Sequence, residues 1–100
     1  MSQGQWQAGG EDVLALSGEL TRHSVPDLWK QAPERLQRLK GEAQIDLSGV
    51  TRMDSAGVAF LLECQRFCLA RSVSLRFAQM PEHMRALVEL ANLQPLFAPA

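Results

Sequence analysis

The chain has 100 residues, 46% of them hydrophobic and 21% charged, and its ten basic and eleven acidic side chains leave a net charge of −1. This length suits one domain with one core, so we expect a single domain over residues 1–100. Balanced charge gives no electrostatic footprint for nucleic-acid binding. No run approaches the roughly 18 apolar residues that a membrane helix needs, and "MSQGQWQAGG" does not resemble a secretory signal. We therefore expect a soluble, cytoplasmic protein without direct membrane insertion.

The N-terminal part of the chain predicts two strands that could form a hairpin. Gln5 to Gln7 is a short candidate for an edge strand, and the "GG" pair at 9–10 is the expected turn. The alternating segment "DVLALSG" then predicts a strand over 12–17 that ends at Gly18.

The next segment predicts an amphipathic helix, because its apolar residues recur at spacings of three and four: Val25, Leu28, Trp29, Ala32, Leu36 and Leu39. Ser24 is a suitable N-cap, and Asp27 could complete a capping box. Pro33 lacks a backbone donor and should kink or split this helix, which we expect to end at Gly41.

The second half of the chain alternates between strands and helices. Strands are expected at 44–49 and 73–77, with a long helix between them and a last helix from Pro81 to about Asn92. Strands separated by helices run largely parallel, with the helices packed on the sheet. The predicted fold is a small α/β domain with a four-stranded mixed sheet and about three helices.

The long helix carries apolar residues on two sides. One side gathers Val58, Leu61, Leu62, Cys68 and Leu69, and the other gathers Ala56, Phe60, Cys64 and Phe67. The second side could pack under a neighbouring helix or contact a partner. The two cysteines are four residues apart and could share a metal, but no second cysteine pair lies nearby and His23 and His83 are far away in sequence, so buried, reduced thiols are expected.

The tetrapeptide "DSAG" at 54–57 stands where the third strand meets the long helix. Ser55 does not fit a catalytic nucleophile elbow, because Met53 occupies the place of the first glycine and no histidine is positioned as a base. The sequence also lacks a glycine-rich phosphate-binding loop, so no nucleotide or other cofactor is expected. Either Asp54 or Ser55 is expected to cap the helix.

Two stretches resemble the signature of the STAS domain family: "IDLSGVTRMDSAGVAFLL" at 45–62 and "LALSGEL" at 14–20. The resemblance implies the STAS-type α/β fold. In the anti-sigma factor antagonists of this family a second hydroxyl residue accepts a phosphate, but here Ala56 takes that place and Thr21 replaces the aspartate after "GEL". With these two differences and the stretch "PDLW" at 26–29, the sequence resembles the small stand-alone STAS subunit of a phospholipid transporter more than it resembles the antagonists.

The resemblance implies a non-enzymatic cytoplasmic subunit that binds the ATPase of an ABC transporter, and through it the permease complex, for phospholipid transport between membranes. ATP would be held by the partner. The expected partner-binding residues are Ser55, with Asp54 and Gly57 shaping its loop and Phe60 and Phe67 as apolar contacts. The alternatives are an anti-sigma factor antagonist phosphorylated on Ser55, and a hydrolase that uses Ser55.

Overall fold

The computed structural model of the chain describes residues 4–85. Its elements are β1 (Gln5–Gly10), β2 (Val13–Leu20), α1 (Val25–Leu36), β3 (Glu42–Met53), α2 (Ser55–Ala70), β4 (Ser74–Ala78) and the 3-10 helix η1 (Glu82–Met84). The sheet order is β1-β2-β3-β4, with β1 antiparallel to β2 and the other two pairs parallel. The predicted α/β fold with a four-stranded mixed sheet is confirmed.

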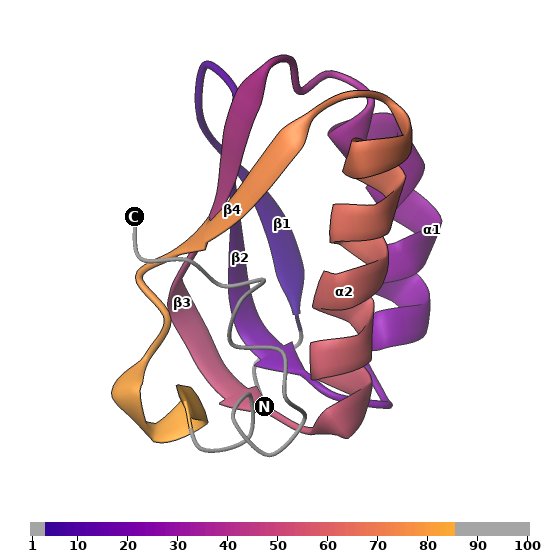
Figure 1. Cartoon of the computed structure of the whole chain (residues 1–100). Helices are drawn as coiled ribbons and strands as arrows, with labels where there is room; N and C mark the ends of the chain where they lie inside the picture. Colours follow the sequence, from indigo (N-terminus) through magenta and orange to yellow (C-terminus); the bar gives the residue numbers. More distant parts are fainter. Residues whose placement is uncertain (1–3, 86–100) are drawn as a thin grey trace.

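Both α-helices cover the same face of the sheet and lie side by side (Figure 1). Each helix joins two neighbouring parallel strands, and the strands follow one another in a single direction across the sheet. Because such crossovers share one hand, both helices must fall on one face. The two helices also begin at the carboxyl ends of β2 and β3, which brings the β2–α1 loop and the β3–α2 loop to one edge of the sheet.

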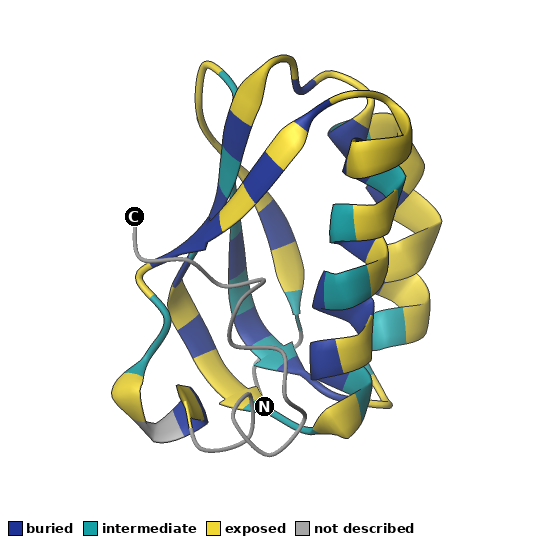
Figure 2. Ribbon diagram, viewed as in Figure 1, coloured by how far each residue is buried: buried dark blue, intermediate teal, exposed yellow. Residues whose placement is uncertain are grey.

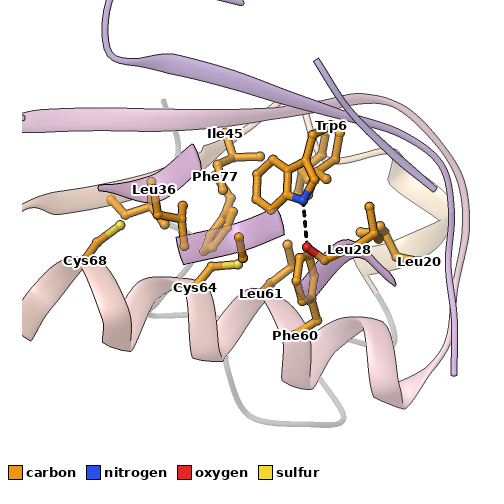
Figure 3. Packing of buried hydrophobic residues seen from close by; sticks show 14 of the residues in the cluster. Trp6, Leu20, Leu28, Leu36, Ile45, Phe60, Leu61, Cys64, Cys68 and Phe77 are labelled. Atoms are coloured by element: carbon orange, nitrogen blue, oxygen red, sulfur yellow. Dashed lines mark hydrogen bonds between the residues drawn. The ribbon is translucent and has the colours of Figure 1, made fainter. Parts of the chain in front are cut away.

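The core lies between the sheet and the two helices. Burial alternates along β3 and β4 and follows the inner side of each helix, while the outer sides are exposed (Figure 2). Trp6 closes the core at β1, where its indole N–H donates to the Leu28 carbonyl oxygen at 2.9 Å and its ring meets Phe60 at 5.8 Å (Figure 3). A buried indole needs such an acceptor, so this bond fixes β1 against α1.

The hairpin is confirmed, but its turn and strand ends differ from the prediction. Gly9 and Gly10 belong to β1, and the turn falls at residues 11–12, where Asp12 has a positive φ of 55°. β2 continues through Gly18 to Leu20, because Gly18 (φ 80°) sits beside a shift in the β2–β3 register. A glycine in a strand therefore marked an irregularity and not the end of the strand.

Helix α1 contradicts three details of the prediction. It is continuous through Pro33, so the expected split is wrong; Pro33 lies in the last turn on the exposed side, where its missing N–H costs one bond only. The helix ends at Leu36, before Gly41. Ser24 occupies the N-cap position without a side-chain cap bond, and Asp27 forms an exposed ion pair with Lys30 at 3.8 Å in place of a capping box.

The last predicted helix lies mostly outside the described residues. Within them, Pro81 precedes η1, which spans Glu82–Met84, and Met84 is buried in the core. None of the helices in residues 4–85 is long and apolar enough to cross a membrane.

Candidate functional site

The candidate site is the edge of the sheet where the β2–α1 loop (residues 21–24) and the β3–α2 loop with the first turn of α2 (residues 54–57) lie together. Leu20 pairs with Met53 at the ends of the two parallel strands. The backbone N–H of Asp54 then donates to the carbonyl oxygen of Leu20 at 3.1 Å. Segments more than thirty residues apart in sequence thus share one surface.

Asp54 joins these two loops through both oxygens of its carboxylate. Oδ1 accepts the N–H of Gly57 at 3.1 Å, and Oδ2 accepts the N–H of Arg22 at 3.0 Å. The first bond caps α2, so the predicted cap is Asp54 and not Ser55. The second bond connects the neighbouring loop, and sequence reasoning did not anticipate it.

The surroundings of Asp54 favour its ionised form. Burial of the carboxyl opposes ionisation, but hydrogen bonds from the backbone N–H groups of Arg22, Gly57 and Ala56, with the charge of Arg22, outweigh it and lower the pKa of Asp54 below its ordinary value of 3.8. The carboxylate is therefore charged at neutral pH and holds both loops in place.

Ser55 is the first residue of α2, and its side chain is exposed. Within residues 4–85 its hydroxyl makes no hydrogen bond, because Asp54 supplies the cap. Residues 4–85 therefore leave both the donor and the acceptor positions of this hydroxyl without a partner.

Gly57 is required by close packing between α2 and the end of β2. A Cβ atom at this position would overlap the carbonyl oxygen of Leu20 and would lie 2.8 Å from Cγ of Met53. Only a residue without a side chain lets the first turn of α2 approach β2 this closely. Gly57 thus sets the position of Ser55 relative to the β2–α1 loop.

The two predicted apolar contacts differ in accessibility. Phe60 is only 3% exposed, with its ring edge-on to Trp6 and to Trp29 at 6.0 Å, so it packs under α1 and offers no surface to a partner. Phe67 is partly buried and carries the guanidinium of Arg71 5.5 Å above its ring. Leu69, assigned to the same side as the core residues of α2, is 70% exposed.

Trp29 and Arg22 belong to the candidate site although the sequence did not single them out. Trp29 is 37% exposed and packs on Phe60, about one turn along α2 from Ser55. Arg22 reaches the site only through its bond to Asp54, a contact across 32 residues that no sequence pattern reveals. The sequence feature that could have indicated this surface is Trp29, a large aromatic residue on α1, the helix that follows the β2–α1 loop.

The site offers no arrangement for metal or covalent chemistry within the described part of the chain. No hydrogen bond there links Ser55 to a histidine, and no group of three or more metal-ligating side chains occurs. Cys64 and Cys68 are free thiols in the core, and burial raises the pKa of both, that of Cys68 from 9.0 to about 11.

Comparison with known proteins agrees with this geometry. Residues 4–97 match the family described as "Mlab, STAS domain". The chain belongs to this STAS family. It is 34% identical over 88 residues to the intermembrane phospholipid transport system binding protein MlaB of Escherichia coli (strain K12), which covers 88% of this chain and 87% of MlaB.

Solved structures share the STAS fold. The phosphorylated form of the Bacillus cell fate determinant SpoIIAA has a TM-score of 0.67 at 20% identity, over 97% of this chain and 90% of SpoIIAA. A sulfate transporter family protein from Wolinella succinogenes has a TM-score of 0.70 at 14% identity, over 92% of this chain and 76% of the other. At such identities the likeness shows the fold alone.

Proposed function

We propose that this STAS domain is a non-enzymatic subunit that binds the ATPase of an ABC transporter for intermembrane phospholipid transport. The 34% identity to MlaB, whose name places it in such a transport system, supports the process. The observation that carries the binding role is the exposed Ser55 hydroxyl, which has no partner within residues 4–85 and is held by a loop that Asp54 and Gly57 fix. ATP and its hydrolysis belong to the partner, and the chain is attached to the inner membrane through the complex.

Apolar contacts beside the serine complete the proposed surface. Trp29 exposes part of its ring where it packs on Phe60 of α2, and Phe67 lies further along α2, partly exposed. Tryptophan is enriched among the residues that dominate binding at protein interfaces. Phe60 contributes from within, because its ring supports Trp29.

The test is co-purification of the ATPase with Ser55 variants, beside thermal melts of each isolated variant. Ser55→Ala should lower binding modestly, since one interface hydroxyl contributes about 0.5–1.5 kcal/mol. Ser55→Arg should abolish most of the binding, because a large charged side chain blocks close approach of the partner. Both variants should melt like the wild type, because the side chain is exposed and the cap is supplied by Asp54.

The matched control is Ser74→Arg, which places the same side chain at an exposed serine at the start of β4, away from the candidate site. This variant should retain the ATPase fully. If Ser55→Arg also retains it, the loop at 54–57 is not the docking site.

The second candidate function is an anti-sigma factor antagonist switched by phosphorylation of Ser55. Its supports are the exposed hydroxyl and the fold shared with SpoIIAA, which has been solved in a phosphorylated form. A phosphate would add about −1.5 to −2 charge beside the carboxylate of Asp54, while the N-terminus of α2 would favour it. Ala56 provides no second hydroxyl. Phosphopeptide mass spectrometry of the native protein decides the matter, since substantial modification of Ser55 would select the switch.

A further inference from the structure

The β2–α1 loop is held by hydrogen bonds and presents two exposed side chains beside the β3–α2 loop. The N–H of Thr21 donates to Oγ of Ser24 at 3.0 Å, and that hydroxyl donates to the carbonyl oxygen of Glu19 at 2.6 Å. Thr21 is 5% exposed. Because the loop backbone is bonded internally and to Asp54, Arg22 and His23 are left as its exposed side chains.

The guanidinium of Arg22 has no acidic partner among residues 4–85. Its Nε donates to Nε2 of His23 at a long 3.5 Å, and both oxygens of the nearby Asp54 already accept backbone N–H groups. Three other exposed cations lie within 4 Å of a carboxylate three or four residues away in sequence: Lys30 with Asp27, Arg38 with Glu34, and Arg66 with Glu63. Arg22 thus forms no salt bridge within the described residues, although its charge favours the ionised form of the neighbouring Asp54.

We infer that the docking surface is composite: Asp54 is a positioning residue that holds the β2–α1 loop beside Ser55, and Arg22 on that loop binds a carboxylate of the protein partner. This inference rests on the proposed function and adds the chemistry of the partner surface. An exposed guanidinium that forms no salt bridge is complementary to a carboxylate, which it can bind through two parallel hydrogen bonds.

The charge pattern favours an acidic protein surface over an anionic membrane. Basic segments that bind membranes gather about four to eight Lys or Arg residues. Here the loop carries one arginine and one histidine, and the chain as a whole has a net charge of −1. One arginine suits a single specific contact.

The experiment is calorimetric titration of the purified chain with the purified ATPase of its transporter, at low and at raised salt. We expect Arg22→Glu to weaken binding by about tenfold or more, and Arg22→Gln to reduce the salt dependence. The matched control is Arg76→Glu, the same charge reversal on exposed β4, paired with the amino half of β3. It should bind like the wild type.

A second pair of variants tests the positioning role. Asp54→Asn keeps the side-chain shape but offers only one acceptor oxygen for two N–H groups, so binding should weaken by about tenfold and the amide proton of Arg22 should exchange faster. Asp12→Asn is the control, because Asp12 likewise holds a distant loop by accepting the N–H of Lys40 at 3.0 Å, at the opposite end of the sheet. It should change stability without changing binding.

The outcomes separate this inference from the proposed function. Loss of binding in Ser55→Arg with none in Arg22→Glu overturns the composite surface and leaves the proposed function standing. Retention by both variants overturns both. Cosedimentation of the chain with phosphatidylglycerol vesicles that is lost in Arg22→Glu, while ATPase binding is unchanged, would overturn the assignment to a protein carboxylate.

Discussion

Asp54 performs two structural tasks with a single carboxylate, and each oxygen serves one of them. Oδ1 caps α2 and Oδ2 anchors the β2–α1 loop. Asparagine or serine at this position could cap the helix equally well, but neither has two acceptor oxygens. The identity of this residue is therefore set by the contact between loops and not by the helix alone.

The lowered pKa of Asp54 predicts a loss of stability in acid. Its pKa is below 3.8 in the folded state and close to that value when unfolded, so its stabilising contribution is complete above the unfolded pKa and is lost as pH falls through the folded pKa. Denaturant unfolding of the wild type and of Asp54→Asn from about pH 7 to about pH 2.5 measures the difference. The free energies of unfolding should converge at the acid end, and parallel curves would contradict the prediction.

At the scale of elements, α1 shows how local sequence signals are overridden by position. Pro33 is a strong helix breaker in a helix interior, yet it is tolerated in the last turn on an exposed side. Leu39 follows the helical spacing and is buried at 5% exposure, although it lies beyond the end of α1. Periodicity identified which side chains face the core, but not where the hydrogen-bonded helix ends.

The close packing of α2 against β2 predicts that Gly57→Ala destabilises the protein, which is the opposite of the usual effect of this change in a helix. In an ordinary helix this change stabilises by about 1 kcal/mol, because alanine is the better helix former. Here the new Cβ would overlap the carbonyl oxygen of Leu20, so α2 must shift away from β2. We expect destabilisation by about 1–3 kcal/mol, measured by urea unfolding. A stabilised variant would show that the first turn of α2 has room to move.

At the scale of the whole molecule, the sequence was sufficient for the order of the elements, the mixed sheet and the loop at 54–57. Strands separated by helices must be largely parallel, and Asp54 is a recognisable cap. The burial of Phe60 was left open, because the apolar side of one helix does not reveal which element covers it. Arg22 could not be placed at all, since its position depends on a hydrogen bond between distant loops.

The two core thiols predict a loss of stability in alkali. Burial raises the pKa of Cys64 and Cys68, the latter from 9.0 to about 11, so the folded thiols stay protonated where unfolded thiols ionise. Stability should be unaffected below about pH 9 and should fall as pH rises above it. Unfolding curves of the wild type and Cys68→Ala between about pH 8 and about pH 11 test this, with a shallower decline expected for the variant.

Accessibility to a thiol reagent gives an independent check of the same burial. The native protein should react with it only as fast as it unfolds, because both thiols are buried. Reaction at the rate of a free thiol would show that the core admits solvent at α2.

The hairpin between β1 and β2 places its turn at the end of the sheet remote from Ser55. β2 has eight residues, which at about 3.3 Å each extend roughly 25 Å from the turn to the β2–α1 loop. Gly10 has open space around it and Glu11 is exposed. A fluorophore or an affinity tag attached at Glu11 would therefore lie away from the proposed docking surface, which makes this turn a suitable position for labelling the protein in binding experiments.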